Sequence, residues 1–206
     1  MLDIAMNHLP DLALAGALAW GAGIRLYLVA FLFGIAAFMG WWKLPEHLAL
    51  LSHPLVLGAS GFMATVEMFA DKIPWLDSVW DGLQTFLRIP AGAAMAAAVF
   101  GDSGMAITMA AAILGGSLTA TTHLAKSGTR AAANTSPEPF SNIALSLTED
   151  VAVVGGTWLA VNQPLIFIGL LLLFIIAAIV LIRVLIKGFR RLKNGLRTKA
   201  DEVLGN

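Results

Sequence analysis

The sequence predicts an all-α fold, a polytopic membrane helical bundle with about six transmembrane helices. Hydrophobic residues make up 58% of the 206 residues and charged residues only 13%, whereas soluble proteins carry about 25% charged residues. The apolar residues also form blocks of about 20, the length that a helix needs to cross a bilayer. The chain has no cysteine, which excludes disulfides and thiolate metal sites, and we expect no cofactor.

The apolar blocks predict six spans, some of them kinked or broken, at about residues 12–39, 54–71, 83–100, 105–125, 140–161 and 165–186. The second, third and fifth spans are the least hydrophobic, so we expect them to face protein and the sixth to face lipid. In the first span, Gly16, Gly21 and Gly23 have two interpretations. They either let helices pack closely or mark a bent helix that lines a cavity. Acidic spans in both halves of the chain are also compatible with a weak inverted repeat.

The distribution of Lys and Arg predicts a multi-pass protein of the plasma (inner) membrane with both termini cytoplasmic. The segments assigned to the inside hold Lys72, Arg88, Lys126, Arg130 and the basic tail, whereas the outer loops hold only Lys43. We divide the chain into a transmembrane bundle, residues 1–186, and a basic amphipathic tail, residues 187–206. The tail is expected to continue the sixth span as a helix and bend onto anionic lipid of the bilayer. Small-residue faces leave room for a homo-oligomer, and nothing favours nucleic acid.

The fifth span carries two adjacent acids, Glu149 and Asp150, in "SNIALSLTEDVAVVGGTWLAV". A charge at this depth costs several kcal/mol, about 3 or more, so each acid should be paired, protonated or bound to a ligand. Arg25 of the first span is the expected counter-ion. Adjacent helical residues point about 100° apart, so one arginine does not serve both acids alike. Either the acids only lock two spans together, or one of them binds a proton or cargo.

A second acidic group lies at the end of the second span, in "VEMFADKIPWLDSVWDG". Glu67 and Asp71 are four residues apart on one helix face, and Asp77 and Asp81 repeat the spacing. Like charges at this spacing repel, so we expect a shared cation, proton or basic side chain. The alternative, strongest for Asp77 and Asp81, is an ordinary solvated helix end. Whether any of these acids binds a metal stays open.

A third group is polar and lies in "THLAKSGTRAAANTSPEPFSN". Lys126 and Arg130 are four residues apart and are followed by Asn134 and Asn142, which suits an anionic headgroup or phosphate. The alternative is that the cations only anchor the inner side of the bundle. His123, in the same stretch, is weak evidence for a site by itself.

The stretches "VEMFADKIPWLDSVWD" and "KSGTRAAANTSPEPFSNIALSLTED" resemble the integral-membrane family catalogued as domain of unknown function 4126, over about residues 12–165. The resemblance implies a polytopic helical membrane protein and brings no activity with it. The residues that match the family motifs are Glu67, Ala70, Asp71, Lys72, Pro74, Asp77, Lys126, Arg130, Asn134, Ser136, Pro137, Asn142, Ser146, Glu149 and Asp150.

A fainter likeness is to small cation exchangers built from two inverted repeats with a Glu-x-Gly-Asp-Lys signature. Here the spacing in "EMFADK" is one residue longer, and the glycine is absent. We therefore expect a small secondary transporter or exchanger that uses Glu67, Asp71, Glu149 and Asp150 as a proton or cation relay, with Arg25 as counter-charge. The first alternative is a protein that binds or flips a lipid or lipid phosphate. A membrane-embedded hydrolase ranks last, because no HExxH or GxSxG motif occurs.

Overall fold

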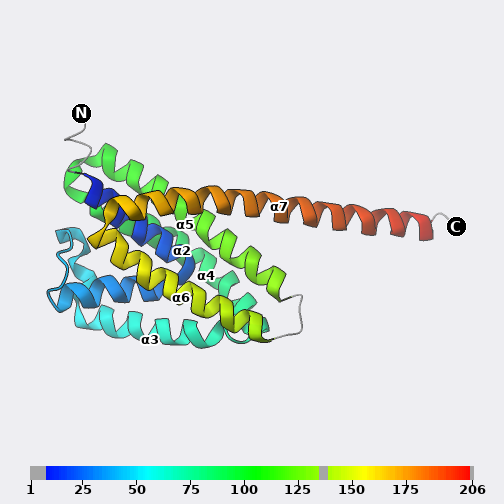
Figure 1. Ribbon diagram of the computed structural model, residues 1–206, viewed down its shortest axis with the longest axis horizontal. Helices are drawn as coiled ribbons and strands as arrows, with labels where there is room; N and C mark the ends of the chain where they lie inside the picture. The colour runs from blue at the N-terminus through cyan, green and yellow to red at the C-terminus, as the bar shows by residue number, and fades with distance from the viewer. Residues whose placement is uncertain (1–7, 135–138, 205–206) are drawn as a thin grey trace.

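The computed structural model describes residues 8–134 and 139–204, and these form helices with no β-strand. The predicted all-α helical bundle is therefore confirmed. Ser136 and Pro137 of the family motifs lie outside the described residues, as does the side chain of Asp77. In chain order the elements are α2 (Leu9–Phe38), the 3₁₀ helix η1 (Glu46–Ser52), α3 (Pro54–Ala70), α4 (Pro74–Val99), the 3₁₀ helix η2 (Gly101–Ser103), α5 (Met105–Ala133), α6 (Pro139–Asn162) and α7 (Pro164–Leu204) (Figure 1).

Helix α2 reverses its direction at Arg25, which has non-helical backbone angles (φ −144°, ψ 78°). A Cβ atom added to Gly21 would lie 2.7 Å from the side chain of Val29, although eight residues of straight helix span about 12 Å. Pro10 and Trp42, from the two ends of the segment, line the same small pocket. Residues 9–24 and 26–38 thus form a re-entrant hairpin. Of the two interpretations of Gly16, Gly21 and Gly23, the bent helix fits this reversal, and close packing of helices also occurs, because an added Cβ on Gly23 would meet Thr119 and Thr122.

This hairpin forms the centre of the bundle. More than half of the apolar stretch of α2 is buried inside the protein, against 11% of the corresponding stretch of α7. The prediction that the last span faces lipid agrees with this low burial. The prediction that the second span faces protein was wrong, since only Leu57, Ser60, Glu67 and Ala70 of the 17 residues of α3 are buried. The low hydropathy of this span comes from a few buried polar residues and does not place the helix at the centre of the bundle.

By length and composition, four of the described helices are apolar enough to cross a membrane, or up to five if bent pairs are single spans. The four are α2, α5, α6 and α7, and the bent pair is η1 with α3. The apolar helices thus indicate an integral membrane protein. Six long segments occur where six spans were predicted, but α2 turns back within the bundle. Helix α2 is long and apolar enough to be selected as a span, but a helix that turns back does not cross the membrane.

The reversal of α2 also changes the topology. The start of α2 lies at the same end of the bundle as Trp42, and His47 of η1 pairs with Asp102 of η2 at 3.0 Å. The α3–α4 turn, the end of α5 and the start of α6 lie at the other end, toward which α7 runs (Figure 1). The prediction that both termini lie on the same side of the membrane assumed that α2 crosses the membrane. With α2 re-entrant, the start of α2 and the end of α7 lie at opposite ends.

Helix α7 continues without interruption from Pro164 to Leu204. The expected helical continuation into the tail is therefore present. The expected bend is not: the helix runs on straight beyond the bundle (Figure 1). The boundary between bundle and tail near residue 187, and its contact with anionic lipid, stay predictions.

Cysteine labelling tests the topology, and the natural chain has no cysteine to interfere. Single cysteines at His8, His47 and Asp102 should react with a membrane-impermeant maleimide from one side of the membrane. Cysteines at Lys72 and Arg190 should react only from the other side, because the α3–α4 turn and the end of α7 lie at the opposite end of the bundle (Figure 1). A cysteine at His8 that reacts together with Lys72, and not with His47, would show that α2 crosses the membrane.

The variant Gly23→Ala tests the close packing of α2 against α5. A Cβ at Gly23 would lie 2.7 Å from the backbone oxygen of Thr119 and 2.6 Å from the Cβ of Thr122. Gly23→Ala should therefore cost about 1–3 kcal/mol of stability, read as a lower midpoint of thermal unfolding in detergent. Gly58→Ala on α3 is the matched control, because nothing lies within 4 Å of its added Cβ. Equal midpoints for the two variants would contradict the tight packing at Gly23.

Candidate functional site

The reversal of α2 places Arg25 within a network of buried charges contributed by helices α2 to α6. Four cations and five carboxylates belong to it among the described residues. The cations are Arg25, Arg88, Lys126 and Arg130, and the carboxylates are Glu67, Asp71, Asp81, Glu149 and Asp150. Each cation is at most 6% exposed, which would be costly without partners.

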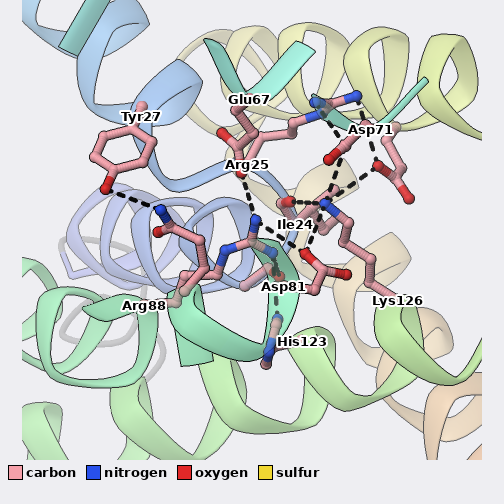
Figure 2. A network of polar contacts seen from close by, with 12 residues as sticks. Ile24, Arg25, Tyr27, Glu67, Asp71, Asp81, Arg88, His123 and Lys126 are labelled. Atoms are coloured by element: carbon pink, nitrogen blue, oxygen red, sulfur yellow. Dashed lines mark hydrogen bonds and ion pairs between the residues drawn. The ribbon is translucent and has the colours of Figure 1, made fainter. Parts of the chain in front are cut away.

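Asp71, at the C-terminal end of α3, is the centre of this network. Its Oδ2 atom lies 2.8 Å from Arg25 Nη1, 3.2 Å from Lys126 Nζ and 3.2 Å from Arg130 Nη2. Its backbone oxygen accepts another hydrogen bond from Arg130 Nη1 at 2.8 Å. The side chain of Asp71 is fully buried. One of its carboxylate oxygens therefore contacts cations of both α2 and α5 away from solvent. Figure 2 shows Arg25 and Lys126 converging on Asp71.

The two adjacent acids of α6 have different partners. Glu149 accepts two hydrogen bonds from Arg130, at 3.1 and 2.7 Å, and lies within 3.7 Å of Arg25 and 3.6 Å of Lys126. Asp150 contacts Arg25 Nε at 3.0 Å. Their side chains are 15% and 24% exposed, more than any other carboxylate of the network. These two acids are therefore the part of the network that is nearest to the surface.

A second centre lies between α3 and α4. Arg88 Nη2 makes a short contact with Glu67 Oε1 and lies 3.3 Å from Asp81 Oδ1. Arg88 Nη1 lies 3.2 Å from Nδ1 of His123 (Figure 2). Nε2 of His123 lies 2.7 Å from the Thr85 hydroxyl. A guanidinium only donates, so Nδ1 must accept and the proton of the imidazole sits on Nε2. His123 is therefore neutral and adds no positive charge.

The break in α2 also exposes backbone carbonyls, which the cations satisfy. Arg88 Nη1 donates to the oxygen of Gly23 at 3.3 Å, and Lys126 Nζ donates to that of Ile24 at 3.1 Å. These are the last carbonyls of residues 9–24, where a helix ends with partial negative charge. Arg25 in turn donates to the hydroxyl of Ser146 at 2.8 Å. The network thus holds the re-entrant hairpin at its turning point.

The structure brings together seven of the nine residues selected from the sequence: Glu67, Asp71, Glu149, Asp150, Arg25, Lys126 and Arg130. Lys126 and Arg130 are not at the surface but buried against carboxylates. Asn134 and Asn142 lie beside the network, with Asn142 Nδ2 donating to Asn134 Oδ1 at 2.6 Å. Their contact with an anionic headgroup stays untested.

Sequence reasoning did not include Arg88 in the site and counted it only among the cations of the inner side. It is fully buried in α4. The signal was available, because the buried residues Asp81, Gln84 and Arg88 are spaced three and four apart and continue into Gly92 and Ala96. This spacing is typical of one buried face of a helix, with polar residues in its first half and small residues in its second half. Asp81, assigned to a solvated helix end, is likewise buried at 4% exposure.

Among the described residues, no group of three or more His, Asp or Glu side chains has a geometry that could hold a metal ion. The arrangement instead pairs carboxylates with cations.

Removing the charge of Asp71 tests whether it centres the network. Asp71→Asn leaves three buried cations with less compensation, so it should cost about 3–5 kcal/mol and lower the unfolding midpoint strongly. Asp102→Asn is the matched control, since the Asp102 side chain is 84% exposed and the change should cost less than about 0.5 kcal/mol. Adding Lys126→Met to Asp71→Asn should restore part of the loss. Equal midpoints for parent and Asp71→Asn would refute this role.

No curated protein and no solved structure matches the chain in the comparisons made. A family model described as "Domain of unknown function (DUF4126)" matches residues 12–184. This match includes all four cations and all five carboxylates of the network, and it extends the resemblance seen in the two motifs nearly to the end of the apolar segments. The chain belongs to the family of proteins that contain domain of unknown function 4126.

Proposed function

We propose that the protein is a small secondary transporter whose buried network takes up and releases a proton or another monovalent cation. The observation that carries this proposal is the imbalance among the described residues, where five carboxylates face four cations and a neutral histidine. One uncompensated charge inside a membrane protein costs several kcal/mol, about 3 or more. A proton or a bound cation removes this cost, and its exchange is the elementary step of a coupled transporter.

Glu149 and Asp150 are the acids best suited to exchange this charge. They are the most exposed carboxylates of the network, whereas Glu67 and Asp71 have side-chain exposures of 1% and 0%. Both share Arg25 with Asp71, so a change of charge at α6 is felt at the end of α3. A relay of this kind joins the surface of the network to its buried centre.

The broken helix supports the same function. Non-helical backbone at membrane depth is tolerated where it is buried in protein or lines a cavity, and transporters build ion sites at such breaks. Here the carbonyls of Gly23 and Ile24 face cations of the network. A purely structural network would explain the pairing of Asp71 but gives no reason for the excess carboxylate.

Binding of a lipid phosphate has less support. Lys126 and Arg130 are the cations that a phosphate would need, and both already contact Asp71 and Glu149. An added anion would increase the excess of negative charge. A hydrolase has no support from His123, which is 2% exposed and held between Thr85 and Arg88.

The proposal includes an orientation in a plasma (inner) membrane. The half-buried Lys72 and the exposed Lys187 and Arg190 lie toward the end with the α3–α4 turn, whereas Lys43 lies at the end with η1 (Figure 1). By the positive-inside rule, the α3–α4 turn and the end of α7 are cytoplasmic, and the start of α2 is outside.

Proton flux into proteoliposomes that contain a pH-sensitive dye tests the function. A membrane potential and gradients of Na⁺ and K⁺ are imposed in turn, and at least one should drive a flux above that of protein-free vesicles. Glu149→Gln and Asp150→Asn should lower the flux at least tenfold in variants that remain folded by circular dichroism. Asp102→Asn, far from the network, should leave it unchanged. Parental flux in both acid variants, or no protein-dependent flux under any gradient, would reject the proposal.

A further inference from the structure

A cavity of about 470 Å³ lies beside the network, between α2, α5, α6 and α7. This volume is within the range of about 300–1,000 Å³ that small-molecule sites occupy. Most of the lining is apolar and includes Trp20, Phe174 and Leu181. The two charged residues in the lining are Lys126 and Glu149. The cavity therefore has an apolar body and a charged end that belongs to the network.

The charge that the cavity presents is negative. The ammonium of Lys126 donates to the oxygen of Ile24 and lies within 3.6 Å of carboxylates of Asp71, Asp81 and Glu149, so it is compensated. The Glu149 side chain is more exposed than that of Lys126, at 15% against 2%. Glu149 is in turn paired with Arg130, so the negative charge at this end comes from the network as a whole, in which five carboxylates face four cations among the described residues.

The hydroxyl groups of the lining favour the same kind of ligand. Thr122, Thr129 and Thr148 each donate to a backbone oxygen four residues earlier in their own helix. Their hydrogens are thus engaged, and the oxygens are left to accept or to face positive charge. An anionic ligand would find no free hydroxyl donor here.

The aromatic residues of the lining also favour a positively charged ligand. The Trp20 and Phe174 rings meet edge to face, with centroids 5.9 Å apart, and both line the cavity. Aromatic faces attract organic cations, by about 0.5–2 kcal/mol for each good contact. Apolar walls, aromatic rings, acceptor oxygens and an excess carboxylate together describe a site for a positively charged molecule with a large apolar surface.

We infer that this cavity binds a lipophilic organic monocation as the cargo of the transporter. The inference rests on the proposed function, and it names the substrate class. In one state the excess carboxylate holds a proton, and in the other it faces the organic cation. One monocation replaces one proton, so the network stays neutral in both states. A lipid acyl chain would fill the apolar part equally well but would leave the excess charge without compensation.

Equilibrium binding to the full-length protein in detergent tests this inference. The probes are tetraphenylphosphonium and the anion tetraphenylborate, which have nearly the same shape and opposite charge. Tetraphenylphosphonium should bind at a saturable site, at least tenfold tighter than tetraphenylborate. Glu149→Gln should weaken the binding of the cation at least tenfold. Each variant is first checked for folding by circular dichroism and gel filtration.

Two variants that reduce the cavity locate the site. Ala152→Leu on α6 and Ala177→Leu on α7 both add volume to the lining, and Ala177 is exposed, so its exchange should not disturb the core. Each should weaken tetraphenylphosphonium binding at least tenfold. Ala144→Leu is the matched control, because Ala144 is an exposed residue of α6 that does not line the cavity. It should bind like the parent.

The other outcomes overturn the inference in distinct ways. Equal binding of both probes, lost in Ala152→Leu, would indicate an apolar site for a lipid chain. Binding unchanged in both cavity variants would place the cation elsewhere, and no binding to the folded parent would reject this substrate class. In each of these cases, a proton flux that depends on Glu149 and Asp150 would leave the proposed function standing. Charge-selective binding in the cavity without such a flux would instead reject the transporter and retain the site.

Discussion

The contact of one carboxylate oxygen of Asp71 with three cations is the interaction on which the rest of the structure depends. Arg25, Lys126 and Arg130 come from the turning point of α2 and the last third of α5, and all approach Oδ2 within 3.2 Å. These contacts fix the end of α3 against the hairpin. Asp71 also holds Lys126 in place, and Lys126 donates to the carbonyl of Ile24 at the break of α2.

The network specifies this arrangement more than it stabilises the protein. Burying ion pairs costs desolvation energy that the pairing only roughly offsets, so apolar residues of the same shape could hold the helices as firmly. A hairpin that reverses inside a membrane protein, however, leaves backbone groups without helical partners. Charged side chains of the right length satisfy those groups, and their fixed spacing on α4 and α5 allows only one position for the turn.

The same network gives the cavity beside it a chemical character. Glu149 belongs both to the ion pairs around Arg130 and to the wall of the cavity, so it connects the structural centre with an accessible surface. Its neighbour Asp150 points around the helix toward Arg25 and does not line that cavity. The two adjacent acids thus occupy different environments, as their angular separation on a helix requires. This separation allows Glu149 to contact both Arg130 and the cavity while Asp150 contacts Arg25.

The sequence by itself determined the helical bundle, at least one end of each long helix to within about three residues, and most members of the network. Long apolar blocks require helices in a bilayer, and charged residues such as Arg25, Glu149 and Asp150 within those blocks require partners. The tertiary structure decided which residues became partners. Glu67 was expected to act with Asp71, yet it pairs with Arg88, a residue counted only among the cations of the inner side. It also decided the reversal of α2, because a 30-residue apolar stretch has the same composition whether it crosses the membrane or turns back. Only packing separates these two paths, since the break is stable solely where side chains of other helices supply the hydrogen bonds that the backbone gives up.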